Sequence, residues 1–551
     1  MAVTLTINGQ SVPASPGLSI FDQAESLGVD VPTSCRKQGK CKECMVEVVE
    51  GMALLSPVTE AERHLKGAFR LSCQTTVTAA DGHVRCHTMR RGQMRIERHA
   101  LGLPLGARSF PVDPAVTRDG ERILIDGVEV ERCWGPIHGL AADLGTTTVV
   151  LRLLDLETGE LIADASFENP QRFAGAEVMS RIAYDTEHPG RLLLRTLAGY
   201  LSHAIEKFPV DPKSIYEMVV VGNSTMRDLF FRHSVYTIGQ TPYRSITEID
   251  MAEGRRTSTT LTQNGLRSLL PIHPKARVYG APIISGHVGA DAAAAMLAVD
   301  LAHEDRLVAI MDIGTNTELI VGNRHRILAA SCPAGPAFEG GAIACGMPAL
   351  DGAIESVSIG DNSALRLRVI GDAPPEGICG SGLVELLSEL LRTGRMNDKG
   401  RFEDDLQRVV LHRAGHAPGQ DVFLLESDVN ELAQAKGANV AGLHVVFSTY
   451  GIDFDGLDLF YLAGGFGRHL SIEAAQRIGL IPSLPASKVV QAGNLAIEGA
   501  TIALLSRSKR RELEDLVKRV QHCRLETHPG FFDYFVEGCQ FKPVEPMPCP
   551  R

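Results

Sequence analysis

Two segments of the chain, about 170 residues apart, follow the same plan, and this repeat constrains the fold more than any other feature. The first segment is "HGLAADLGTTTVVLRLLDLETGELI" and the second is "LVAIMDIGTNTELIVGNRHRILAA". In each, an apolar strand ends at an aspartate, a Gly-Thr turn with further hydroxyl groups follows, and a second apolar strand begins. Because the copies lie too far apart for a short solenoid repeat, they predict two similar lobes.

The two turns carry residue types that suit phosphate binding. Glycine lets backbone N–H groups approach phosphate oxygens, and threonine hydroxyls add donors. The aspartates can hold Mg2+ through water or orient an attacking water. A single turn of this kind would resemble many tight hairpins, whereas the repeated pair is much more specific. We predict Asp143 and Asp312 as catalytic residues and the following as nucleotide-binding residues: Gly145, Thr146, Thr147, Gly314, Thr315, Asn316 and Thr317.

A third motif, "LDLFYLAGGFGRHLS", places several glycines at the end of an apolar strand. Alone, it would more often be a structural turn between a strand and a helix. After the two Asp-Gly-Thr turns, we interpret it as an adenosine loop in which Gly464, Gly465 and Phe466 contact the nucleotide. The chain has no G-x4-G-K-[ST] sequence, and neither turn leads directly into a helix, so a P-loop or dinucleotide site is not supported.

The three motifs together resemble the superfamily of actin, sugar kinases and heat-shock ATPases. In that superfamily two RNase-H-like α/β lobes clamp ATP. The resemblance covers residues 137 to about 520.

The segment "CRKQGKCKEC" brings three cysteines together with the spacing C-x5-C-x2-C, and a fourth cysteine follows 28 residues later. A zinc site would be expected as two C-x2-C pairs, and only one is present here. Disulfides are disfavoured by the size of the chain and its expected compartment. An iron–sulfur cluster needs four thiolates, with three from one loop. We therefore predict a [2Fe–2S] cluster bound by Cys35, Cys41, Cys44 and Cys73.

This loop is one residue longer than the plant-type spacing, and it is similar to that of the [2Fe–2S] ferredoxins of the adrenodoxin kind. The surrounding pattern predicts a small β-grasp domain. Asn8-Gly9 is a hairpin turn signal, and Ser19 can cap a short helix that carries Asp22 and ends at Gly28. Cys86 is expected within a strand rather than as a ligand.

Composition narrows the class of protein. The 551 residues predict three or four domains, and the formal net charge of −11 argues against a nucleic-acid or membrane-surface role. The sequence contains no apolar run long enough for a spanning helix, and its start does not resemble a signal peptide. We expect a soluble cytoplasmic protein with mostly reduced thiols.

The segment between the cysteines and the first lobe is rich in arginine and proline. We interpret it as a solvated linker that lets the cluster domain swing, and the alternative is a basic strip that contacts an acidic electron-transfer partner. The expected fold is multidomain α+β, with these parts: residues 1–90, a [2Fe–2S] ferredoxin-like domain; 91–136, the linker; 137–275, the first lobe; 276–530, the second lobe with ATP-binding elements; and 531–551, a C-terminal tail.

Over most of its length the chain resembles the reductive activators of corrinoid proteins, iron–sulfur ATPases that serve cobalamin-dependent methyl transfer. The segments that carry this resemblance include "CRKQGKCKECMVEV", "ADLGTTTV", "ENPQRFAGAEVMSRI", "VVGNSTM", "GADAAAAM", "MDIGTNTELIVG", "CPAGPAFEGGAIACGMPA", "GICGSGLVELL", "LAGGFGRHLSIEAAQRIGLIP" and "GNLAIEGA".

The resemblance implies an ATP-hydrolysing reductase that returns the inactive Co(II) state of a corrinoid methyltransferase protein to Co(I), with one electron from its [2Fe–2S] cluster. It implies ATP and Mg2+ as further cofactors. The implied partners are a corrinoid protein and a low-potential electron donor, and a homodimer would suit the superfamily. The segments "CPAGPAFEGG" and "GICGSG" are candidates for the cobalt side, although such loops are equally often phosphate-side backbone.

The chain departs from some relatives, which carry clustered C-terminal cysteines for [4Fe–4S] centres. Here Cys523, Cys539 and Cys549 are too widely spaced for that pattern. We interpret three further cysteines as small buried residues rather than a second cluster: Cys332, Cys345 and Cys379.

Two alternative functions remain open. One is an ATP-driven electron injector for another low-potential acceptor, of the 2-hydroxyacyl-CoA dehydratase type. Those activators usually hold a [4Fe–4S] cluster between two subunits, unlike the loop in this chain. The other is a nucleotide-gated redox sensor.

Overall fold

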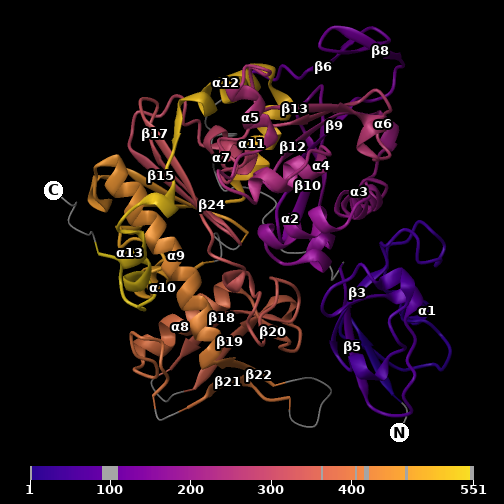
Figure 1. The fold of residues 1–551 in the computed structure, drawn as a ribbon, viewed down its shortest axis with the longest axis vertical. Coiled ribbons are helices and arrows are strands. Elements are labelled where there is room, and N and C mark those ends of the chain that lie inside the picture. The colour runs from indigo at the N-terminus through magenta and orange to yellow at the C-terminus, as the bar shows by residue number, and fades with distance from the viewer. Residues whose placement is uncertain are drawn as a thin grey trace. The chain divides into compact units, whose positions relative to one another are not determined.

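A computed structural model describes residues 3–89, 110–360, 364–403, 406–414, 421–465 and 470–545 (Figure 1). The chain forms two compact units. The first contains residues 3–89 and Val112–Gly280, and the second contains the residues from Ala281 onward. Among the described residues, no helix is both long enough and apolar enough to cross a membrane.

The N-terminal domain is a five-stranded sheet of order β2-β1-β5-β3-β4 with one helix, as expected for a β-grasp domain. Its elements are β1 (Thr4–Ile7), β2 (Gln10–Pro13), α1 (Ile20–Ser26), β3 (Met45–Glu50), β4 (Phe69–Leu71) and β5 (His83–Thr88). Asn8 and Gly9 both have positive φ, as the hairpin signal predicts. Ser19 and Asp22 form a capping box at the start of α1.

Part of the predicted linker is folded. A three-stranded antiparallel sheet occupies this segment: β6 (Val116–Asp119), β7 (Arg122–Ile125) and β8 (Val128–Arg132). Asp126 and Gly127 have positive φ and join Ile125 to Val128 in a two-residue hairpin. The prediction of a linker rests on the arginines and prolines of the segment and does not take this Asp-Gly turn signal into account. The expectation of a swinging cluster domain also differs from the structure, since the N-terminal domain and the first lobe belong to one compact unit.

The first lobe is a six-stranded sheet of order β11-β10-β9-β12-β14-β13. Its strands are β9 (His138–Leu144), β10 (Thr148–Asp155), β11 (Leu161–Glu168), β12 (Ile215–Val221), β13 (Leu261–Asn264) and β14 (Arg277–Gly280). Its helices are α2 (Val178–Glu187), α3 (Leu192–Ile205), α4 (Ser224–Phe230), α5 (Ile246–Ala252) and α6 (Gly265–Ser268). Strand β9 is buried throughout, which explains its continuous apolar run.

The second lobe is a six-stranded sheet of order β24-β23-β15-β16-β17-β25. Its strands are β15 (Val308–Ile313), β16 (Thr317–Gly322), β17 (Ile327–Cys332), β23 (Leu459–Ala463), β24 (Val489–Gly493) and β25 (Val520–His522). Its helices are α7 (Ala290–Ala298), α9 (Glu426–Tyr450), α10 (Ile472–Arg477), α11 (Leu495–Leu505), α12 (Arg507–Leu516) and α13 (Phe531–Gly538).

An insertion between β17 and α9 carries two small sheets and one helix. Its elements are β18 (Ala353–Ile359), β19 (Leu365–Val369), β20 (Gly377–Ile378), α8 (Gly380–Arg392), β21 (Arg408–His412) and β22 (Val422–Leu425). Cys332, Cys345 and Cys379 all lie in the second compact unit and are buried, as expected.

The two lobes share one topology. In each, the first three strands pair antiparallel, and two later strands run parallel to the first: β12 and β14 with β9, and β23 and β24 with β15. The remaining strand differs, because β13 pairs with β14 in the first lobe, whereas β25 pairs with β17 in the second. The predicted repeat is therefore confirmed as two RNase-H-like α/β lobes. In both, the repeated aspartate lies at the end of the central strand, where the chain turns back.

Candidate functional site

The structure brings the four predicted cluster cysteines together. Three lie in the loop between α1 and β3, and Cys73 lies in a short turn after β4. The Sγ atoms of Cys44 and Cys73 are 3.3 Å apart. Ser72 fixes this approach, because its N–H and its hydroxyl both donate to the carbonyl of Cys44, at 2.8 and 2.9 Å. Cys86 lies buried in β5, as predicted.

Hydrogen-bond donors surround these sulfur atoms. The hydrogen bond from Cys44 lowers the pKa of the Cys73 thiol to about 6. Burial opposes ionisation of Cys35, but hydrogen bonds from Cys41 and from the N–H of Lys40 hold the pKa of Cys35 below its usual value. Four thiols with backbone N–H groups directed at them are the donor set that a [2Fe–2S] cluster requires.

The first Asp-Gly-Thr turn is braced by side chains that the sequence analysis quoted only within longer motifs. Nδ2 of Asn223 donates to the Thr146 hydroxyl at 2.8 Å, and Arg181 donates to the Thr146 carbonyl at 2.7 Å. Nδ2 of Asn169 donates to the carbonyl of Gly145 at 2.8 Å. These donors fix the backbone of the turn. The sequence repeat could not reveal them, because all three residues lie outside the two repeated segments.

The second turn is strongly acidic. Asp312 lies at the end of β15 directly opposite Glu318 of β16. Burial raises the pKa of Glu318 well above its usual value, and the charges of Asp291 and Asp312 raise it further. Burial also raises the pKa of Asp291, at the start of α7, to about 6. The carboxyl groups of Asp291, Asp312 and Glu318 therefore interact electrostatically at this end of the sheet.

The sequence analysis missed Asp291 and Glu318 as site residues. The available signal was the presence of an acidic side chain inside an otherwise apolar stretch, in "GADAAAAM" and "TELIVG". The first lobe has no matching pair, because the residue opposite Asp143 is Val150.

Glu339 reaches the second turn from the segment "CPAGPAFEGG". The Thr315 hydroxyl donates to its carboxylate, and the N–H of Gly335 donates to the Thr315 carbonyl at 2.8 Å. This segment therefore supports the second Asp-Gly-Thr turn. Thr317 is fully buried in β16, and its hydroxyl has no hydrogen-bond partner among the described residues.

Gly464 brings the end of β23 onto the end of β15. Its φ is +108°, and a Cβ atom there would lie 2.3 Å from the carbonyl oxygen of Ile313 and 3.1 Å from Oδ1 of Asp312. Only glycine fits this close approach. Gly465 has open space beside it, and Phe466 lies outside the described residues. Asp312, Gly314, Thr315 and Gly464 are thus assembled at one end of the second sheet.

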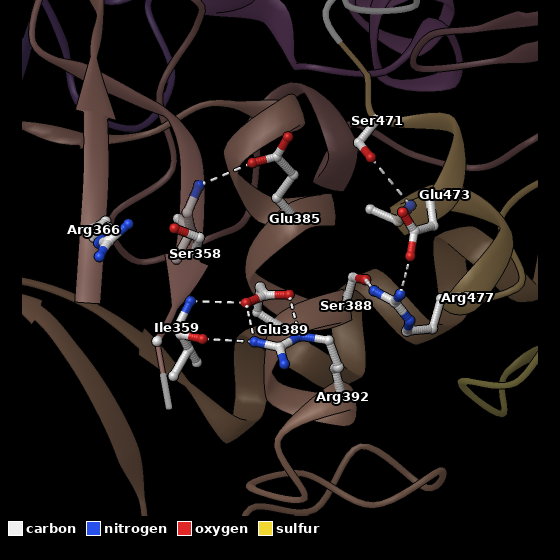
Figure 2. A pocket seen from close by; sticks show the side chains of 13 residues that line it. Ser358, Ile359, Arg366, Glu385, Ser388, Glu389, Arg392, Ser471, Glu473 and Arg477 are labelled. Carbon is white, nitrogen blue, oxygen red and sulfur yellow. Dashed lines mark hydrogen bonds and ion pairs between the residues drawn. The ribbon is translucent and has the colours of Figure 1, made fainter. Parts of the chain in front are cut away.

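A cavity of about 780 Å3 lies between β18, α8 and α10 (Figure 2). Arg477 donates to the Ser388 hydroxyl at 2.7 Å and pairs with Glu473. Arg392 pairs with Glu389 at 2.7 Å, and Glu389 accepts the N–H of Ile359 at 2.7 Å. The cavity lining mixes arginine, glutamate and serine, and Ser471, which caps α10, belongs to it.

Three family models match the chain. Residues 3–78 match the 2Fe-2S iron-sulfur cluster binding domain, residues 138–304 match the RACo middle region, and residues 306–551 match the C-terminal domain of RACo, described as the ASKHA domain. The last match confirms the predicted actin and sugar-kinase type of ATPase domain.

The chain is also similar to named proteins over most of its length. It is 28% identical to the corrinoid activation enzyme RamQ of Eubacterium limosum, over 98% of this chain and 99% of the relative. It is 24% identical to the [Co(II) methylated amine-specific corrinoid protein] reductase of Methanosarcina barkeri, over 73% of this chain and 76% of the relative. A solved structure described as "Reductive activator for corrinoid,iron-sulfur protein" superposes with a TM-score of 0.73 and 26% identity, covering 98% of this chain and 99% of the other.

The matched regions follow in the order of the domains seen here, and the full-length relatives share that order from end to end. The β-grasp domain with its four neighbouring cysteines and the two RNase-H-like lobes with their Asp-Gly-Thr turns agree with these matches. The protein belongs to the RACo family of corrinoid reductive activators, in which a 2Fe–2S domain precedes the RACo middle region and a C-terminal ASKHA domain.

Proposed function

We propose that this protein uses ATP to return the inactive Co(II) state of a corrinoid methyltransferase protein to Co(I). One observation carries the proposal: a single chain brings four cysteines together in its N-terminal domain and places an acidic Asp-Gly-Thr turn in a domain of the ASKHA kind. The names of its full-length relatives support the corrinoid protein as acceptor. A homodimer, a low-potential electron donor and a cytoplasmic location remain predictions.

The energetics explain why both parts are needed. When bound, a [2Fe–2S] cluster supplies one electron, in plant-type ferredoxins at about −400 mV. The Co(II)/Co(I) step requires a very low potential, and each 59 mV of mismatch is about tenfold in the equilibrium constant of a one-electron step. ATP binding and hydrolysis can drive this step if closure of the lobes changes the way in which the protein binds its partner.

Each group of residues has a proposed role. Cys35, Cys41, Cys44 and Cys73 hold the cluster. Asp312 holds Mg2+ and orients the attacking water, and Asp291 and Glu318 add negative charge nearby, while the braced turn at Asp143 binds phosphate oxygens. The approach of two thiols, the acidic residues around Asp312 and the hydrogen bonds to the first turn support these roles.

We further propose that the cavity between α8 and α10 receives the base and ribose of the nucleotide. Ser471 lies close to Gly464 in the sequence, and Gly464 contacts the end of β15, so a nucleotide whose phosphates lie at β15 could extend into this cavity. A planar guanidinium such as that of Arg477 can stack on a purine, and serine and glutamate side chains can bond ribose hydroxyls.

The function is tested with a partner corrinoid protein, a low-potential reductant and Mg-ATP under anaerobic conditions. We expect the Co(I) absorbance band to grow only when both ATP and an intact cluster are present. The Co(II) partner should also stimulate ATP hydrolysis more than a methyl-Co(III) partner, which needs no activation. Full Co(I) formation without ATP would contradict the mechanism, and no ATP turnover with any corrinoid protein would favour a redox sensor.

The cluster ligands are tested by a matched pair of cysteine variants. Cys44→Ser should lose or strongly perturb the visible chromophore, because one of four thiolates is removed, whereas Cys86→Ser should keep it. Iron content and electron paramagnetic resonance measure both, and they also separate a [2Fe–2S] from a [4Fe–4S] centre. Loss of iron in Cys86→Ser would show that the fourth ligand is wrongly chosen.

The nucleotide carboxylates are tested by replacing them with amides. Asp312→Asn should lower ATP hydrolysis by about 100-fold, because an amide is a poor ligand and cannot accept a proton. Asp143→Asn should act in the same direction, while cluster reduction stays normal in both. Asp305→Asn, an exposed change in the same unit, is the control. Unchanged hydrolysis in both test variants would place the site elsewhere.

The cavity is tested by measuring ATP affinity. Arg477→Ala should weaken ATP binding by about tenfold, since it removes a stacking surface and a charged donor. Arg368→Ala removes an exposed arginine of β19 that does not line the cavity, and it should leave the affinity unchanged. Calorimetric titration measures the affinity of both variants for ATP. If the two variants bind ATP equally well, the cavity is not the binding site of the base.

A further inference from the structure

The cysteine loop is anchored from outside its own domain. Glu43, between two of the predicted ligands, is only 6% exposed. Its carboxylate accepts a hydrogen bond from the Ser34 hydroxyl at 2.6 Å and lies 3.0 Å from Nε2 of His203 in α3 of the first lobe. A buried carboxylate is stable only when it is paired in this way.

Helix α3 has the shape to receive this side chain. The hydroxyl of Tyr200, itself fully buried, donates to the backbone carbonyl of Glu43 at 2.8 Å. A Cβ atom at Gly199 would lie 2.9 Å from Oε1 of Glu43 and 3.0 Å from its Cγ and Cδ atoms. Glycine is unfavourable inside a helix, and here it leaves the space that the carboxylate occupies.

Other contacts extend the same interface. The Tyr184 hydroxyl donates to the carbonyl of His64 at 2.9 Å, and the N–H of Lys66 donates to the carbonyl of Phe173 at 3.3 Å. The buried side chains of the N-terminal domain and the first lobe belong to one continuous apolar cluster. The exposed pair of Lys207 with Asp30 adds little, because solvent screens it.

The buried contacts therefore distinguish a docked domain from a tethered one. A domain that swings on a linker would be expected to carry a polar surface here. Instead the loop that holds the cluster cysteines places its one buried carboxylate, and the carbonyl of the same residue, against a single helix.

We propose that Glu43 is a positioning residue that fixes the cluster loop on α3, so that the 2Fe–2S domain and the middle region work as one electron-transfer body. The inference rests on the proposed function and deepens it. If the 2Fe–2S domain and the middle region stay together, the movement needed during activation occurs in the rest of the chain or in the partner protein. Glu43 acts through the loop and need not touch the electron acceptor.

The test uses the reconstituted full chain with Gly199→Ala and His203→Ala, which alter α3 and leave every cysteine in place. Ser202→Ala is the control on the same helix, because its hydroxyl bonds Leu269 of the first lobe. Hydrogen–deuterium exchange of residues 34–44, iron content and the midpoint potential of the cluster are measured for each variant.

We expect normal iron content in all three variants. In the two test variants, exchange of residues 34–44 should rise about tenfold, because the loop loses its anchor. The midpoint potential should also rise, because water reaching the loop stabilises the more negative reduced cluster. Wild-type exchange or an unchanged potential in both test variants would overturn the proposal.

A double-variant cycle sharpens the result. Glu43→Ala should raise exchange at least as much as His203→Ala does, because it also removes the Ser34 contact, and the double variant should go no further than Glu43→Ala. Additive effects would overturn the proposal. Co(I) formation should fall in the test variants, and rapid Co(I) formation by an undocked loop would also overturn it. If the wild-type chain reduces no corrinoid protein, the proposed function fails, while exchange and potential still decide whether Glu43 docks the loop.

Discussion

The acidic end of β15 is the constraint on which the second lobe depends. Asp312 and Glu318 face each other across two paired strands, and Asp291 adds a third acidic group. Like charges at a partly buried site repel one another, which is why the charges of Asp291 and Asp312 raise the pKa of Glu318. The close approach of Gly464 to Ile313 serves the same end of the sheet, because it brings a third strand end to the acidic turn.

The two lobes share a topology and differ in charge. In the first lobe, Val150 occupies the position opposite the aspartate, and amide and guanidinium donors from Asn169, Asn223 and Arg181 brace the turn. Such a turn offers donors that suit phosphate oxygens. The acidic turn of the second lobe suits a metal ion. Duplication of one fold therefore accounts for the shared framework, while the side chains around each turn give the copies complementary chemistry.

The cluster loop meets two demands with a few residues. It supplies cysteine thiols together with backbone N–H groups that donate to their sulfur atoms. It also carries Glu43, which contacts His203 on helix α3, 160 residues further along the chain. An electron carrier benefits from such anchoring, because the transfer distance is then set by packing rather than by a tether. The small sheet β6–β8 is consistent with such anchoring, because part of the segment predicted as a flexible linker is a folded sheet.

The local pattern of the sequence determined the β-grasp hairpin, the capped helix α1, the four cysteines and the two repeated turns. These features depend on spacing, on turn residues and on strand periodicity, all of which are written along the chain. Only the tertiary structure decided that Glu318 faces Asp312, that Glu339 reaches Thr315, that three side chains brace Thr146 and Gly145, and that Glu43 docks on α3. Each of these contacts joins residues whose pairing depends on strand register or on packing between elements distant in sequence. Such pairings cannot be predicted from local patterns in a single sequence. Local periodicity shows which face of an element is buried, but it does not show which distant side chain packs against that face.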